Sequence, residues 1–139
     1  MREKDINVKI LAFYTFSNFS APKWLKEALI FMSKNPTVER NFQAKLIKEL
    51  RTKYPKDIIF KNDAIQGIPD VLILHGDTWA SLECKRSANA PHRPNQDYYV
   101  DKMNDMAFSR FIYPENKEEV LRELEQSFEA RGNARVSGC

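Results

Sequence analysis

The chain has 139 residues, which is the length of one ordinary domain and excludes a multi-domain enzyme. Its residues are 42% hydrophobic and 29% charged, with only four glycines, so a disordered, collagen-like or low-complexity chain is also excluded. The net charge of +3 at pH 7 is too small to identify a nucleic-acid-binding protein by itself.

Neither a membrane span nor an export signal is expected. The longest stretch without charge, residues 10–22, contains several Ser, Thr and Asn residues and is too short to cross a bilayer as a helix. The charged residues 2–5 are not followed by the apolar region of a signal peptide. We therefore expect a cytoplasmic protein without membrane partners, in the host cytoplasm if a phage encodes it. Cys84 and Cys139 fit neither a disulfide framework nor a zinc site.

The basic residues are concentrated in the first 60 positions, which hold twelve Lys and Arg against six Asp and Glu. Such an excess on one surface attracts DNA phosphates and gives a salt-dependent affinity. A solvated helix face without a partner is the alternative explanation. The candidate DNA contacts comprise four of these residues and two from later in the chain: Lys26, Lys45, Lys48, Lys53, Arg86 and Arg93.

Residues 1–34 are predicted to form an N-terminal extension that contacts DNA or a second copy of the chain. Residues 8–16 have the pattern of a short strand or an irregular hydrophobic segment. Pro22 introduces a helix whose apolar stripe, including Trp24, Leu25 and Leu29, is a candidate homodimer contact. Asn35 followed by Pro36 has the pattern of an N-cap and a first helical turn, so a second helix is expected to begin there. We expect it to end near residue 54.

The remaining periodicities predict three strands, a helix, a strand and a helix within residues 35–130. The strands are expected at 57–60, 71–74 and 78–85, with residues 75–77 as the tight turn of an antiparallel hairpin. A helix follows Pro94, a fourth strand covers 108–113, and a last helix covers 114–130. This order predicts an α/β fold in which helices flank a small mixed sheet. Residues 131–139 are expected to be a flexible tail.

The residues that carry chemistry flank the predicted hairpin. Alternation along residues 78–85 puts Glu83 and Lys85 on one face of the strand, and pairing brings Asp70 near that end of it. The two carboxylates and the carbonyl of Cys84 are oxygen ligands of the kind that Mg²⁺ prefers, and Mn²⁺ is expected to substitute for it. Lys85 then serves to orient or deprotonate a water, or to neutralise phosphate charge. The alternative is an exposed strand edge kept soluble by Glu and Lys.

At these residues the sequence resembles the PD-(D/E)XK nuclease superfamily, and more narrowly the VRR-NUC domains, which are similar to Holliday-junction resolvases. The resemblance covers about residues 37–125 and rests on four stretches: a helix bearing Glu39, then Gly67-Ile68-Pro69-Asp70, Glu83-Cys84-Lys85 and Arg93-Pro94-Asn95-Gln96. Arg93 replaces the family's usual small polar residue, and Cys84 replaces a small or β-branched one. The resemblance implies a restriction-endonuclease-like core.

The resemblance also implies the roles of the site residues. Asp70 and Glu83 would bind the metal, Lys85 would assist the attacking water, Glu39 would support the metal and Gln96 would complete the site. Glu49, on the same predicted helix, is the rival of Glu39. Both histidines, His75 and His92, are interpreted as ordinary loop residues, and Tyr98 and Tyr99 as helix packing.

The expected function is a Mg²⁺-dependent, homodimeric DNA endonuclease selective for branched DNA. Three alternatives remain: a sequence-specific homing or restriction enzyme, a non-catalytic DNA-binding module of the same fold, and a protein-interaction adaptor that uses the apolar N-terminal helix. Loss of Asp70, Glu83 or Lys85 would mark the non-catalytic module, and all three residues are present.

Overall fold

The computed structural model describes the backbone of residues 22–136 and the side chains of residues 22–25 and 37–134. The strand expected within residues 8–16 and the side chain of Lys26 lie outside these ranges. The chain divides into two compact units, Met1–Arg40 and Asn41–Cys139, which we describe separately. Across residues 22–136, no helix is both long enough and apolar enough to span a membrane.

A single helix, α2 (Lys23–Lys53), begins in the first unit and ends in the second. The prediction that Asn35 caps a new helix is therefore wrong. Proline fixes φ near −65°, which is a helical value, so a helix can continue through Pro36 with the loss of one backbone hydrogen bond. The expected end of the helix, near residue 54, is confirmed.

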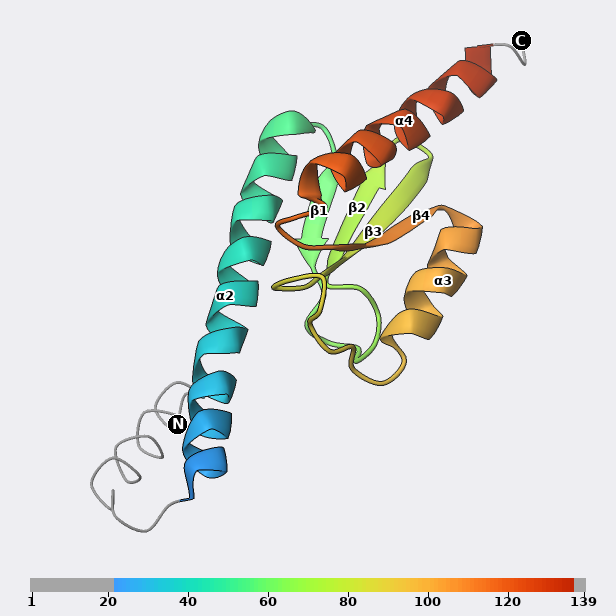
Figure 1. Ribbon diagram of the computed structural model, residues 1–139. Helices are drawn as coiled ribbons and strands as arrows, with labels where there is room; N and C mark the ends of the chain where they lie inside the picture. The colour runs from blue at the N-terminus through green and yellow to red at the C-terminus, as the bar shows by residue number, and fades with distance from the viewer. Residues whose placement is uncertain (1–21, 137–139) are drawn as a thin grey trace. The chain divides into compact units, whose positions relative to one another are not determined.

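The second unit contains a four-stranded mixed sheet in the order β1-β2-β3-β4 (Figure 1). The strands are β1 (Ile58–Lys61), β2 (Val71–His75), β3 (Thr78–Cys84) and β4 (Phe108–Ile112). β2 pairs antiparallel with β1 and β3, whereas β4 runs parallel to β3 and is reached through α3 (Gln96–Met106). The predicted hairpin and the predicted mixed sheet with flanking helices are both confirmed.

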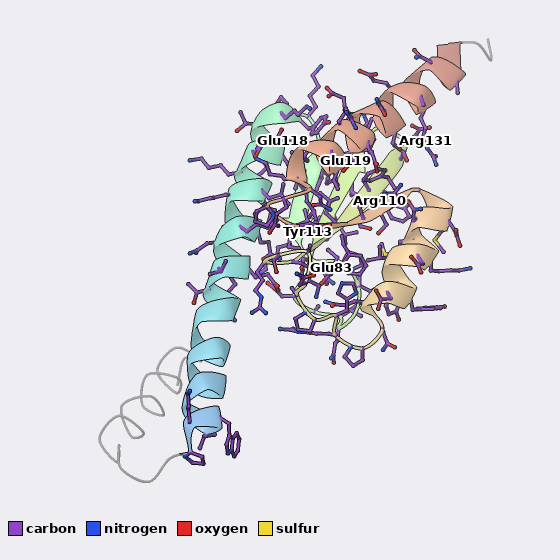
Figure 2. All side chains as sticks on the ribbon, in the orientation of Figure 1. Glu83, Arg110, Tyr113, Glu118, Glu119 and Arg131 are labelled. Atoms are coloured by element: carbon purple, nitrogen blue, oxygen red, sulfur yellow. The ribbon has the colours of Figure 1, made fainter. Side chains whose placement is uncertain are left out.

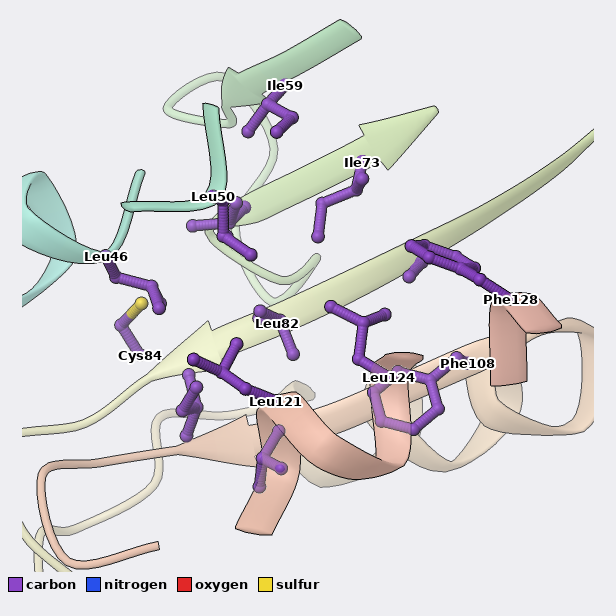
Figure 3. Close-up of a cluster of buried hydrophobic side chains, with 14 residues drawn as sticks. Leu46, Leu50, Ile59, Ile73, Leu82, Cys84, Phe108, Leu121, Leu124 and Phe128 are labelled. Carbon is purple, nitrogen blue, oxygen red and sulfur yellow. The ribbon is translucent and has the colours of Figure 1, made fainter. Parts of the chain in front are cut away.

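One face of the sheet holds the hydrophobic core (Figure 3). Leu46 and Leu50 from α2 and the apolar stripe of α4 (Lys117–Val136) pack against the inward residues of the strands. Figure 1 shows α4 lying across the sheet. From β3 the core takes the residues that alternate with Glu83 and so face away from it: Ala80, Leu82 and Cys84. Because all three are fully buried, β3 is anchored firmly on this side.

The opposite face of β3 and β4 is covered by α3. The Ser81 hydroxyl donates a buried hydrogen bond of 2.7 Å to the Ser109 hydroxyl on β4, and it also contacts the sulfur of Met103 on α3. This face is therefore closed but polar, and it continues along β3 to Glu83.

The last helix is longer than predicted. α4 ends at Val136, whereas the sequence pattern ends at residue 130, so residues 131–136 are helical and the tail prediction is wrong for them. These residues lack an apolar stripe, which is the feature that periodicity detects. A helix that is already packed extends easily, because each added residue gains one hydrogen bond without a new nucleation step.

Candidate functional site

The site lies where β2 begins and β3 ends. Val71 pairs with Leu82, so the register brings Asp70 opposite Glu83. The Asp70 carboxylate accepts a hydrogen bond of 3.0 Å, through Oδ2, from the backbone N–H of Cys84. The predicted convergence of Asp70 with the end of the third strand is thus confirmed. Figure 2 shows Glu83 at the end of the sheet from which the loops lead toward α3.

Glu83, Lys85 and Gln96 form a buried polar network. The Gln96 amide nitrogen donates to Glu83 Oε1, and its amide oxygen accepts from Lys85 Nζ at 2.6 Å. Lys85 Nζ also lies 3.9 Å from Glu83 Oε1. The exposed fractions are 1% for Glu83, 3% for Lys85 and 7% for Gln96. The alternative of an exposed strand edge is therefore wrong, since β3 lies between two strands and both charges are buried.

Residues 91–96 wrap around the Lys85 ammonium. Lys85 Nζ donates to the carbonyl of Pro91 at 3.2 Å, and the Arg93 backbone N–H donates to Gln96 Oε1 at 2.7 Å. Gln96 N–H in turn bonds to the Arg93 carbonyl, which closes a turn with Pro94 second and Asn95 third. Asn95 has φ 70°, the left-handed value that a type II turn needs at that position. The turn places Gln96 as the first residue of α3.

A polar pocket of about 360 Å³ opens beside this network. Asp70, Arg93 and Gln96 line it together with the loop of residues 62–68. Gln96 therefore belongs both to the network and to the pocket wall, and Asp70 lines the pocket beside it. A small polar molecule or a phosphate in the pocket would lie against the candidate residues.

Gly67 lets the pocket loop approach α3. Its φ is +92°, and a Cβ at this position would lie 3.0 Å from the Cβ of Asn95 and 3.1 Å from the Tyr99 ring. A side chain would be strained here both by backbone conformation and by contact. The packing role predicted for Tyr99 is confirmed, whereas Tyr98 is largely exposed and that prediction is wrong for it.

Sequence reasoning missed Asn62, which holds the pocket loop. Its side-chain amide donates to the carbonyls of Ile65 and Ile68, and its oxygen accepts from Ala64 N–H, each at 3.3 Å. Its backbone N–H donates to the Asp70 carbonyl at 2.7 Å. Asn62 and Asp63 follow shortly after the first predicted strand, and such Asn and Asp residues are a typical signal for a loop held by side-chain hydrogen bonds.

The two candidate glutamates of α2 lie in different units. Glu39 belongs to the first unit, so its role beside Asp70 and Glu83 stays a prediction. Glu49 belongs to the second unit, where its carboxylate accepts a hydrogen bond of 2.9 Å from Lys117 on α4. Glu49 thus takes part in a partly exposed ion pair between helices.

The basic candidates differ in their surroundings. Lys53 donates to Glu125 at 3.0 Å, and this hydrogen bond raises the pKa of the Lys53 ammonium above its ordinary value. Lys45 and Lys48 are exposed on α2, Arg86 is half-buried, and Arg93 lines the pocket. Lys53 is therefore engaged within the protein, and Arg93 is the basic candidate adjoining the network.

The interpretation of His75 as a loop residue is wrong, because it is the last residue of β2. Its ring stacks on Phe128 with centroids 4.0 Å apart, and Nδ1 donates to Asp57 at 2.7 Å. His92 lies in a loop as predicted, but it is held by contacts of the same two kinds, which are described below.

Within the described part of the chain, no group of three or more His, Cys, Asp or Glu residues is arranged to hold a metal ion. The predicted metal ligands fall below this number, because only two of their carboxylates, Asp70 and Glu83, come from the second unit.

No family model matches the chain, and no curated protein or solved structure is similar enough to count as a match. The groups available for chemistry at the site are two carboxylates, one buried ammonium and an adjoining polar pocket.

Proposed function

We propose that the chain is a metal-dependent DNA endonuclease with a PD-(D/E)XK core, most similar to the VRR-NUC and Holliday-junction-resolvase-like enzymes. The observation that carries the proposal is the buried Glu83–Gln96–Lys85 network, next to Asp70 and a polar pocket. Removing a carboxylate and an ammonium from water costs several kcal/mol for each ion. A strand needs no such pair for stability, so a chemical role explains its presence better.

The donor set fits a hard divalent cation. The Asp70 and Glu83 carboxylates and the Cys84 carbonyl would hold Mg²⁺ through oxygen atoms only, and Mn²⁺ has the same preference. A bound ion of this kind supplies Lewis acidity toward a phosphate and activates a water for attack.

The chain's own residues position and neutralise charge. The hydrogen bond from Cys84 N–H holds the Asp70 carboxylate toward the end of β3. Gln96 orients both the Glu83 carboxylate and the Lys85 ammonium, since one amide group bonds to each. Lys85 would then stabilise the negative charge that develops on a phosphate during hydrolysis. Arg93, at the pocket wall, would contact a neighbouring phosphate, and Lys45, Lys48 and Arg86 would extend the contact to the DNA backbone.

The substrate we propose is branched DNA, cut by a homodimer that brings one site to each strand. The test is cleavage of a labelled four-way junction, flap, linear duplex and single strand with Mg²⁺, Mn²⁺ or EDTA. Paired cuts in the junction that need metal are expected. Cuts at one sequence of the linear duplex would instead indicate a homing or restriction enzyme.

Asp70→Asn is the decisive variant, because it removes one metal-binding charge without changing volume. We expect cleavage to fall more than about a hundredfold, with DNA binding retained. The matched control is Asp77→Asn, which makes the same change in the turn at the other end of the hairpin. Equal activity of Asp70→Asn and the wild type would refute the proposed site.

A further inference from the structure

Two histidines of this chain make the same pair of contacts at different ends of the sheet. His92 Nδ1 donates to Asp97 at 2.6 Å, and its ring stacks on Phe111 with centroids 4.2 Å apart and planes 14° apart. His75 makes the equivalent hydrogen bond and ring stack at the end of β2. The difference lies in what each histidine holds in place.

His92 stands between the two backbone groups that complete the buried network. The residue before it, Pro91, gives its carbonyl to the Lys85 ammonium. The residue after it, Arg93, gives its N–H to Gln96 Oε1. A shift of residues 91–93 would therefore loosen both Lys85 and Gln96.

The ring on which His92 stacks is also tied to the network. Phe111 lies on β4 in register with Glu83 on β3. Alternation puts the two side chains on the same face, since Ser81 and Ser109, two residues earlier in each strand, bond to each other there. The stack thus fixes residues 91–93 against the strand position that neighbours Glu83.

We propose that His92 is a positioning residue for the Lys85–Gln96 pair. In this role it acts by holding residues 91–93 on Phe111, through the ring stack and the hydrogen bond to Asp97. The inference rests on the proposed function only for its effect on cleavage.

The ring stack contributes more to this positioning than the hydrogen bond to Asp97. The His92 and Asp97 side chains are 35% and 68% exposed, and exposed ion pairs contribute little. Aromatic pairs contribute beyond the area that they bury. His92→Phe, which keeps the stack and loses the hydrogen bond, should therefore preserve the network, whereas His92→Ala should not.

The direct test is hydrogen exchange of the Arg93 amide, followed by NMR without metal or DNA. In His92→Ala we expect this amide to exchange about five to ten times faster than in the wild type, the effect of losing one stacking contact. His92→Phe and the matched control His75→Ala should stay within about twofold of the wild type at this amide. Phe111→Leu removes the other ring of the stack and should accelerate exchange as His92→Ala does.

The kinetic test separates positioning from general loosening. If the wild type cleaves DNA, His92→Ala should lower kcat by about five to ten times with KM nearly unchanged, and His92→Phe should restore it. The inference would be overturned if the Arg93 amide exchanged at the wild-type rate in both His92→Ala and Phe111→Leu. It would also be overturned if His75→Ala accelerated the exchange of this amide as much as His92→Ala does. If the wild type does not cleave, but exchange responds as expected, the endonuclease proposal fails and the positioning role of His92 stands.

Discussion

The two faces of β3 are buried to the same degree and have opposite chemistry. On one face Ala80, Leu82 and Cys84 are fully covered by apolar side chains from α2 and α4. On the other face Ser81 and Glu83 are just as inaccessible: Ser81 donates a hydrogen bond to Ser109, and Glu83 accepts one from Gln96. A single strand of seven residues thus takes part in a hydrophobic core on one face and in buried polar contacts on the other.

The contrast shows which face is explained by stability. Burial of the apolar face stabilises the fold in proportion to the area removed from water. Burial of the polar face carries a desolvation cost that its hydrogen bonds and ion pair only offset. The polar face therefore needs another explanation, and the adjoining pocket with Asp70 points to chemistry.

The largest effect is expected on DNA cleavage, from a substitution on the polar face of β3. Glu83→Gln keeps the volume and can still accept the hydrogen bond from Gln96, but it loses the charge that would bind a metal. We expect cleavage to fall more than about a hundredfold, while binding to a four-way junction, measured by gel shift in EDTA, is retained. Glu49→Gln is the matched control, since Glu49 pairs with Lys117 instead. If Glu83→Gln and Glu49→Gln lost cleavage activity to a similar extent, the loss could not be assigned to the buried polar face of β3.

The next effect concerns the ion pair. Lys85→Met leaves the Glu83 carboxylate buried without its cation and should lower the free energy of unfolding by about 3–5 kcal/mol. The double variant Glu83→Met, Lys85→Met removes both charges and should recover most of that loss, with no cleavage activity. Urea unfolding of the three proteins measures this difference. A double variant less stable than Lys85→Met would mean that the pair is kept for stability.

The smallest of the three effects is expected from a substitution on the apolar face of β3 that leaves the polar face unchanged. Leu82→Ala opens a cavity between the sheet and α4 and should cost about 2–5 kcal/mol of stability. At a temperature where the variant is folded, its kcat should be close to that of the wild type. Thermal unfolding and single-turnover cleavage measure the two quantities. A loss of kcat as large as that in Glu83→Gln would show that the two faces are not separable.

Local pattern was sufficient to predict much of this architecture. Alternation along residues 78–85 assigned Leu82 and Glu83 to opposite faces, and the turn at residues 75–77 fixed the hairpin that brings Asp70 to Cys84. Both features depend on residues close in sequence. The apolar stripe of α4, with Leu121 and Leu124, is also local.

The burial of the polar residues and the contacts of His92, which pattern missed, depend on distant segments. Whether β3 lies at an edge or inside the sheet is decided by β4, which joins it only after α3, so the burial of Glu83 and Lys85 could not be predicted. The stack of His92 on Phe111 likewise joins a loop to a later strand. Two other misses are local: α2 continues through Pro36 because proline has a helical φ, and α4 extends to Val136 because helix continuation needs no apolar stripe.

The proposed function depends on the binding of a divalent cation by Asp70 and Glu83 beside Gln96. The most direct measurement is a titration with Mn²⁺, which broadens the NMR signals of nearby nuclei. We expect the Gln96 side-chain amide and the Lys85 backbone amide to broaden first in the wild type and in Asp77→Asn, and to stay sharp in Asp70→Asn at the same Mn²⁺ concentration. Broadening that begins elsewhere in the chain, or that is unchanged in Asp70→Asn, would rule out a cation site at Asp70 and Glu83.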